Sequence, residues 1–317
     1  YPNYYGHAAD LKPIITEAHQ HHIPVLVDEA HGAHFVLGRP FPQTALRAGA
    51  DAVVQSAHKT LPAMTMGSYL HVNSRRIDRD RLAYYLTVLQ SSSPSYPLMA
   101  SLDLARAYAE EIVKTNRLAK IEKEIAGMKE LFLKIAGVDI SEPADPFIQK
   151  DPLKLCLRSK QGHTGYELKE IFEANGVHPE LADERQVLFV LPLEGKRPLP
   201  PDVISRIGKQ ITSRSAGDTR QAPIEQPSEK VTTLPYGKSV LSAFKTESVP
   251  FNKAAGRISA EQIVPYPPGI PLIMDGERIK QESISQLSRL VDLNTHIQGS
   301  SRLKQKQLTV YIEEEKS

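Results

Sequence analysis

A chain of 317 residues, of which 40% are hydrophobic, can bury a large core and is expected to form two or three globular domains. Its formal net charge of +2 at pH 7 gives no general attraction to nucleic acid or to an anionic membrane surface, so neither partner is expected. The single cysteine excludes an internal disulfide framework, no apolar run approaches the roughly 20 residues that span a bilayer, and no secretory signal is visible, which together predict a cytoplasmic protein.

The first part of the chain alternates between helical patterns and short apolar runs. Residues 10–22 carry apolar side chains at helical spacing, and residues 24–27 form an apolar run that favours a buried strand. Residues 44–48 suggest another short helix and residues 51–55 a second buried strand. Because this alternation is typical of parallel strands joined by helices, it predicts a parallel, doubly wound α/β sheet.

The pattern changes farther along the chain. A third strand is predicted at residues 67–72, and one long helical region at residues 98–135 is expected to lead from one domain into the next. Strands at residues 153–157 and 187–191, separated by a helix at residues 165–174, predict a smaller α+β domain.

Polar residues follow both early strands, at the edge where α/β sheets bind ligands. Asp28 ends the first strand, and Lys59 lies just past the end of the second. A lysine can form a Schiff base with the aldehyde of pyridoxal phosphate (PLP), while a carboxylate keeps the pyridine nitrogen protonated and the ring electron-withdrawing. Asp28 and Lys59 can fill these roles, and Ser56 and His58 could hydrogen-bond the cofactor phosphate.

These residues lie in motifs that resemble a known family. VLVDEAHGAH at residues 25–34 and SAHKT at residues 56–60 resemble the Orn/Lys/Arg decarboxylase family of fold-type-I PLP enzymes. PYPPGIPLI at residues 265–273, followed by GER, resembles the C-terminal domain of that family. The motifs occur in the family's order, and the resemblance extends to about residue 279.

The resemblance implies a role for each matching residue. Asp28 would pair with the pyridine nitrogen, Lys59 would bind the cofactor covalently, and His31 would lie close to it as a second catalytic residue. The loop at residues 91–93 resembles a segment that reaches the partner's phosphate in a dimer, without indicating which serine does so. The implied cofactor-binding residues are Asp28, Ala30, His31, Ser56, His58, Lys59 and Ser92.

The resemblance also implies a domain organisation. Residues 1–125 would form the C-terminal portion of the PLP-binding large domain, residues 126–216 a small α+β domain, residues 217–238 a linker and residues 239–317 a C-terminal α/β domain. The family's upstream phosphate-binding loop and the group that stacks on the other ring face would precede Tyr1. The large domain is therefore expected to be incomplete at its N-terminus.

The function implied is PLP-dependent decarboxylation of lysine or arginine, or of ornithine, by a homodimer or a larger assembly. One alternative keeps the fold and changes the reaction, to an aminotransferase or another lyase. The other is a truncated, non-catalytic binding or assembly module.

A metal site is the remaining possibility for the histidines. His31 and His34 follow Asp28, and a second histidine group occupies residues 19–22. Neither group has the spacing of a closed zinc site, and no cysteines accompany them, so no bound metal is predicted.

Overall fold

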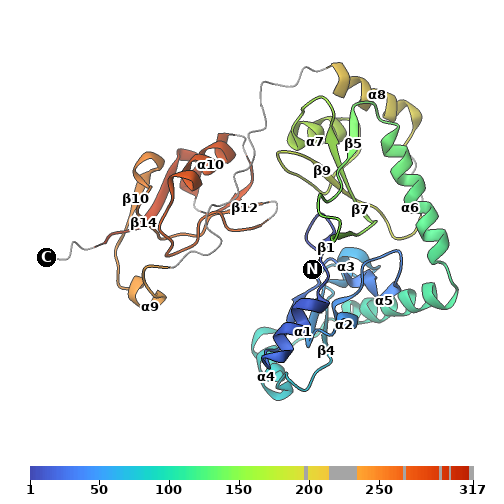
Figure 1. The fold of residues 1–317 in the computed structure, drawn as a ribbon, viewed down its shortest axis with the longest axis horizontal. Helices are drawn as coiled ribbons and strands as arrows, with labels where there is room; N and C mark the ends of the chain where they lie inside the picture. Colours follow the sequence, from blue (N-terminus) through green and yellow to red (C-terminus); the bar gives the residue numbers. More distant parts are fainter. Residues whose placement is uncertain (196–198, 214–233, 267–268, 293–294, 300, 314–317) are drawn as a thin grey trace. The chain divides into compact units, whose positions relative to one another are not determined.

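The computed structural model describes residues 1–195, 199–213, 234–266, 269–292, 295–299 and 301–313. The chain divides into two compact units, Tyr1–Gln221 and Ala222–Ser317, and each has its own hydrophobic core (Figure 1). The linker predicted at residues 217–238 lies outside the described residues as far as residue 233.

The sheet that carries the predicted site has three strands in the order β2 (Leu26–Asp28), β3 (Ala52–Gln55) and β4 (Tyr69–Val72). All three lie within predicted strand regions or overlap them. Strands β2 and β3 pair in parallel, with Leu26 opposite Ala52, but β4 pairs antiparallel with β3, so this sheet is mixed. Helix α3 (Ala57–Thr60) is a single turn, too short to carry the chain across the sheet, and the chain therefore returns beside β3.

Four short elements surround these strands: β1 (His7–Ala8), α1 (Lys12–Gln20), the 3-10 helix η1 (Ala33–Leu37) and α2 (Ala45–Ala48). Helices α1 and α2 confirm the two helices predicted here. Thr44 caps α2, because its side-chain oxygen accepts a hydrogen bond from the N–H of Leu46 (3.2 Å), and Gly49 ends it in the left-handed conformation (φ 104°). Ile15 of α1 is 2% exposed and belongs to the same core cluster as Val53 of β3.

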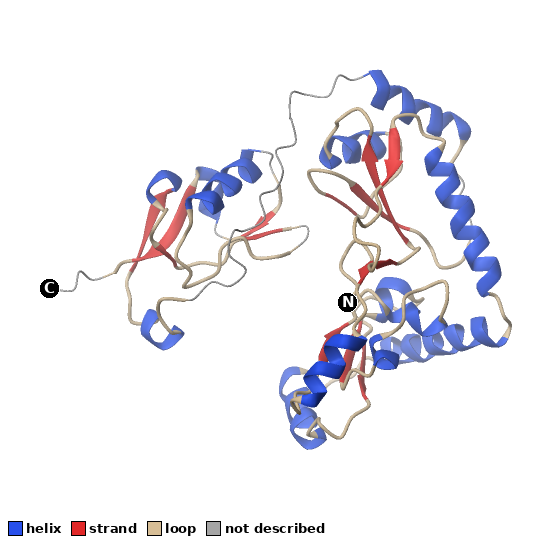
Figure 2. Cartoon of the chain, in the orientation of Figure 1, coloured by secondary structure: helices blue, strands red, loops and turns tan. Residues whose placement is uncertain are grey.

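The long helical region predicted at residues 98–135 is two helices, α5 (Tyr96–Lys114) and α6 (Leu118–Leu133), which run in different directions (Figure 2). The break falls at Asn116, whose backbone is left-handed (φ 52°), a conformation that asparagine tolerates better than most residues. No glycine or proline marks this position in the sequence. The predicted domain boundary at residue 125 falls inside α6, and a further helix, α4 (Arg79–Leu89), precedes α5.

A second, antiparallel sheet occupies the rest of this unit, in the order β5 (Val138–Ile140), β7 (Lys154–Ser159), β9 (Val187–Val190) and β8 (Leu181–Ala182). Helices α7 (Gly165–Ala174) and α8 (Pro201–Ser213) accompany it (Figure 1). The rings of Phe132 and Phe172 both contact Phe189, with ring centroids 4.8 and 5.0 Å apart. Strand β1 pairs with β6 (Gln149–Lys150), which brings the first residues of the chain beside the start of β7.

The second unit is also mixed α and β. Its antiparallel sheet consists of β10 (Thr246–Pro250), β14 (Gln307–Tyr311) and β11 (Ile258–Ser259). Leu287 of helix α10 (Gln281–Asp292) is fully buried in one core cluster with Leu308 and Val310 of β14. The smaller elements are α9 (Lys238–Leu241), η2 (Phe251–Lys253), β12 (Val264–Pro265), β13 (Ile297–Gln298) and η3 (Ser301–Gln305).

Candidate active site

A pocket of about 210 Å³ lies at the carboxyl ends of β2 and β3. It is lined by residues 1–4 together with Asp28, Ala30, His31 and Lys59. Asp28 is the last residue of β2, and Lys59 lies on α3, which follows β3 directly. Because β2 and β3 are parallel neighbours, the residues that follow them emerge at the same edge of the sheet. Four of the predicted site residues are thereby brought together.

His31 contacts Lys59 inside this pocket. The Lys59 side-chain nitrogen Nζ lies 3.2 Å from Nε2 of the His31 ring. Burial, together with the positive charges of Lys154 and Lys59, lowers the pKa of His31 to about 3. His31 is therefore neutral at pH 7, and its Nε2 can accept a hydrogen bond from the amine. The other ring nitrogen, Nδ1, is buried without a hydrogen-bond partner among the described residues.

Asp28 presents its carboxylate at the exposed rim of the pocket. Its Oδ1 accepts a hydrogen bond from the backbone N–H of Ala30 (3.0 Å), which holds the side chain close to the turn that follows β2. No other side-chain hydrogen bond of Asp28 occurs in the part of the chain that the structure describes. The carboxylate therefore retains acceptor capacity for a bound group.

Tyr4 forms a wall of the pocket that sequence reasoning did not single out. Its ring lies 4.8 Å from the His31 ring, centroid to centroid, in an edge-on arrangement. The chain can turn behind it because Gly6 adopts a left-handed conformation (φ 81°) and leaves room for the side chain of Lys154. The only signal in the sequence was the aromatic run YPNYYG, which is not specific for a site.

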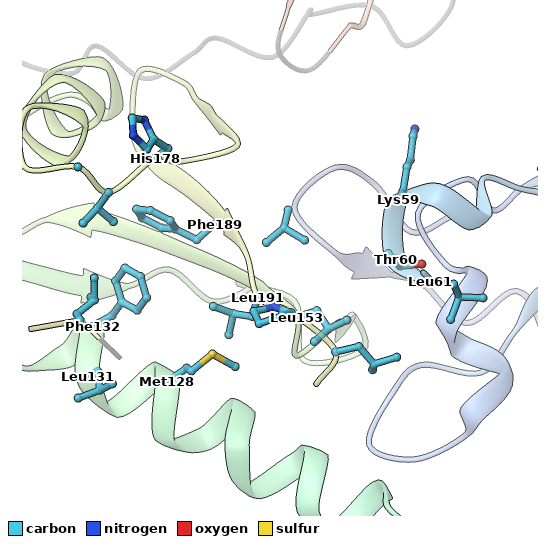
Figure 3. A pocket seen from close by; sticks show the side chains of 16 residues that line it. Lys59, Thr60, Leu61, Met128, Leu131, Phe132, Leu153, His178, Phe189 and Leu191 are labelled. Atoms are coloured by element: carbon cyan, nitrogen blue, oxygen red, sulfur yellow. The ribbon is translucent and has the colours of Figure 1, made fainter. Parts of the chain in front are cut away.

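A larger pocket, of about 560 Å³, is also lined by Lys59 (Figure 3). Most of its wall is apolar and comes from α6 and the β9 region, including Met128, Phe132, Phe189 and Leu191. Figure 3 shows the Lys59 side chain pointing away from these apolar groups. We therefore assign the amine of Lys59 to the smaller, polar pocket.

Comparisons with known proteins bear on this site. The family described as Orn/Lys/Arg decarboxylase, major domain, matches residues 1–151, and the Orn/Lys/Arg decarboxylase, C-terminal domain, matches residues 223–302. The chain belongs to the Orn/Lys/Arg decarboxylase family. The resemblance seen in the sequence motifs is therefore confirmed.

Individual relatives agree with the family. The chain is 58% identical over its full length to "Uncharacterized protein YaaO" of Bacillus subtilis, of which it covers 66%. It is 32% identical over 94% of its length to an "Arginine decarboxylase" of the same species, of which it covers 62%. The crystal structure of the Francisella novicida lysine decarboxylase LdcF matches 98% of this chain and 56% of that one, with a TM-score of 0.68 and 16% identity. The chain thus spans less than two thirds of the length of these relatives and has the fold of a lysine decarboxylase.

Three residues that were predicted to contact the cofactor phosphate do not line the smaller pocket. His58 directs its Nδ1 to the carbonyl oxygen of Gly67 (3.0 Å). Ser56 precedes α3 at its N-cap position and makes no capping hydrogen bond with its side chain. Ser92 is exposed in the loop between α4 and α5. Phosphate contacts from these three residues stay predictions.

The histidines that were considered as metal ligands have separate environments. His34 is fully buried, and its Nε2 lies 3.1 Å from a carboxylate oxygen of Asp151, whereas His31 faces Lys59. Among the residues that the structure describes, no three His, Cys, Asp or Glu side chains gather where they could hold a metal ion.

No helix in the described part of the chain has both the length and the apolar character needed to cross a membrane.

Proposed function

We propose that this member of the Orn/Lys/Arg decarboxylase family removes the α-carboxyl group of a basic amino acid with the help of PLP, and that the substrate is lysine or arginine, with ornithine as a third candidate. The observation that carries the proposal is that Asp28 and Lys59, from the ends of two adjacent parallel strands, line one pocket. Relatives named arginine decarboxylase and lysine decarboxylase support the choice of substrate class.

The pocket residues fit the ring end of the cofactor. Lys59 would bind the aldehyde carbon covalently, Asp28 would face the pyridine nitrogen, and Ala30 would lie against one ring face. The buried, unpartnered Nδ1 of His31 is a polar atom that a bound group or a water could satisfy. When bound, PLP supplies a protonated pyridine ring that accepts the electron pair left behind as carbon dioxide departs.

The chain's own residues would direct this chemistry. The Asp28 carboxylate would hold the proton on the pyridine nitrogen, because a nearby negative charge favours the protonated form. After the substrate's α-amine has replaced it, the Lys59 amine would be free to move protons at the substrate's α-carbon. Neutral His31, 3.2 Å from that amine, would orient it, and the ring of Tyr4 would limit access of water to His31.

The remaining predictions concern the wider protein. We propose that Ser56 and His58 contact the phosphate once the cofactor is bound, and that Ser92 reaches the phosphate held by a partner in a homodimer or a larger assembly. We also keep the cytoplasm as the proposed compartment. The support for phosphate contacts from Ser56 and His58 is that the chain belongs to the same family as the lysine and arginine decarboxylases.

The test starts from the visible absorption that PLP acquires when it is joined to a lysine. The purified protein should show this band, Lys59→Ala should lose it, and Lys12→Ala, which removes an exposed lysine of α1, should keep it. Incubation with lysine, arginine and ornithine should then release carbon dioxide and the corresponding amine from at least one of them.

Each alternative has its own result. A keto acid in place of carbon dioxide would favour an aminotransferase. A stable dimer without the absorption band would favour a non-catalytic assembly module. A band that persists in Lys59→Ala would rule out Lys59 as the cofactor-binding lysine.

A further inference from the structure

Glu29, the residue after Asp28, is fully buried and has an unusual set of partners. Its carboxylate accepts hydrogen bonds from the backbone N–H of Ala45 (2.7 Å), from the hydroxyl of Thr44 (3.2 Å) and from the side-chain amide of Gln55. No ion pair of Glu29 with a lysine or arginine occurs among the described residues. The pKa of Glu29 is raised, because the effect of burial exceeds that of the three hydrogen bonds, which lower it.

One partner of Glu29, Gln55, lies on an element that builds the site. Gln55 is the last residue of β3 and leads into α3, which carries Lys59. The backbone N–H of Glu29 also donates to the carbonyl oxygen of Val54 (2.8 Å). Beyond Gln55, the chain of hydrogen bonds continues to Nε2 of His71 on β4 (2.9 Å). Glu29 therefore joins the carboxyl end of β2 to that of β3, next to Asp28, which lines the pocket.

Gly32 leaves space for the Glu29 side chain, because it has no side chain of its own at that position. A Cβ atom added at Gly32 would lie 2.6 Å from Cγ of Glu29, so only glycine leaves room for the side chain there. Burying a carboxylate without a cation is unfavourable, and an apolar residue of similar size could fill a core position without that cost. Directional hydrogen bonds, in contrast, hold two strand ends in one defined relation, which apolar packing does less well.

We propose that Glu29 is a positioning residue that sets the relation between Asp28 and Lys59 by joining the strand ends that carry them. This inference rests on the proposed function, in which Asp28 and Lys59 act on opposite ends of one cofactor ring. Glu29 itself, being buried, touches neither cofactor nor substrate; it acts through Gln55 and through its peptide bond with Asp28.

The same strand pair provides a matched control. Asp51, which directly precedes β3, is 1% exposed and accepts a hydrogen bond from the backbone N–H of Val25 (2.8 Å), just before β2. It thus joins β2 to β3 at their amino ends, as Glu29 does at their carboxyl ends. Asp51→Asn should weaken the fold without changing the geometry of the site.

The experiment compares Glu29→Gln, Asp51→Asn and the exchange Glu29→Gln/Gln55→Glu. Glu29→Gln replaces one accepting oxygen by an N–H donor, so that either the Ala45 N–H or the Gln55 amide faces a donor, and we expect the Kd for PLP to rise about tenfold. Asp51→Asn also weakens the contacts of Asp51 with His19 (2.7 Å) and Arg76 (3.5 Å), and we expect it to lower thermal stability with the Kd for PLP unchanged within about twofold. The exchange returns a carboxylate opposite an amide, and we expect it to recover most of the affinity. Should Glu29→Gln fail to fold, Gln55→Met removes the same link and should raise the Kd in the same direction.

A second readout needs no cofactor. The nuclear magnetic resonance signal of the His31 ring, which reports its contact with Lys59, should shift in Glu29→Gln and stay in place in Asp51→Asn. If the natural protein binds no PLP but this shift occurs, the proposed function fails and the positioning role stands. Glu29→Gln that loses stability while both the His31 signal and the Kd for PLP stay as in Asp51→Asn would overturn the positioning role.

Discussion

The Nζ atom of Lys59 lies 3.2 Å from the Nε2 atom of His31 in a pocket whose rim carries Asp28. A protonated imidazole beside the amine would repel its positive charge, whereas a neutral ring can accept a hydrogen bond from it. The structure favours the neutral ring, because burial and two neighbouring lysines lower the pKa of His31. The contact therefore orients the amine.

Lys154 should control the protonation of His31. Lys154 is 2% exposed at the start of β7, and after burial its positive charge is the largest cause of the low pKa of His31, ahead of Lys59. We expect Lys154→Met to raise the pKa of His31 above its value of about 3, and by more than Lys59→Ala does. Nuclear magnetic resonance titration of the His31 ring measures this pKa. Lys160→Met, at an exposed position just after β7, is the control and should leave the pKa in place.

Acid should weaken the fold through His31. The pKa of His31 falls from 6.5 in an unfolded chain to about 3 in the fold. Between these values His31 is largely protonated in the unfolded state and neutral in the folded state. The contribution of His31 is therefore fully present above pH 6.5 and is lost as the pH falls towards about 3. We expect the free energy of unfolding of the natural protein, relative to His31→Asn, to decrease between about pH 7 and about pH 4 in urea titrations. A difference that stays constant or grows on acidification would contradict this assignment.

The cluster formed by Phe132 of α6, Phe172 of α7 and Phe189 of β9 should be sensitive to truncation. Phe172 is fully buried, and its ring lies 5.0 Å from Phe189 and 6.4 Å from Phe132. We expect Phe172→Ala to lower the free energy of unfolding by about 3–5 kcal/mol, because it removes apolar contacts and leaves a cavity. Phe147→Ala, at a position that is 83% exposed, should change it by less than about 0.5 kcal/mol in the same chemical denaturation experiment.

The start of helix α7 depends on a reciprocal pair of hydrogen bonds. The Thr164 hydroxyl accepts from the N–H of Glu167 (3.2 Å), and the Glu167 carboxylate accepts from the N–H of Thr164 (2.7 Å). We expect Thr164→Ala to lower the free energy of unfolding by about 1 kcal/mol. Since the two side chains also hydrogen-bond each other, the effects of Thr164→Ala and Glu167→Ala should not add in a double-mutant cycle. Thr87→Ala, exposed within α4, should cost less than about 0.5 kcal/mol.

Part of the fold followed from local pattern. The apolar runs before Asp28 and before Ser56 are strands β2 and β3, and the helical periods at residues 10–22 and 165–174 are helices α1 and α7. The break between α5 and α6 could not be predicted, because Asn116 adopts its left-handed conformation at a position where the sequence has no glycine or proline. The direction of β4 was equally invisible, since a strand's own residues do not specify whether its neighbour is parallel or antiparallel.

The candidate site divides in the same way. Asp28, Ala30, His31 and Lys59 could be named in advance, because each lies within a few residues of a strand end in a family motif. The wall formed by Tyr4, the charge of Lys154 acting on His31 and the link between Glu29 and Gln55 could not. These depend on burial and on contacts between residues far apart in the chain.

Residue order was therefore enough to place a carboxylate and an amine at the ends of adjacent strands, because strand period and strand ends are properties of short segments. Folding decided that the histidine beside the amine is neutral and that a buried glutamate links the two strands. The protonation state of His31 depends on desolvation, and the alignment of β2 and β3 depends on hydrogen bonds between distant residues. Both arise only when the chain folds.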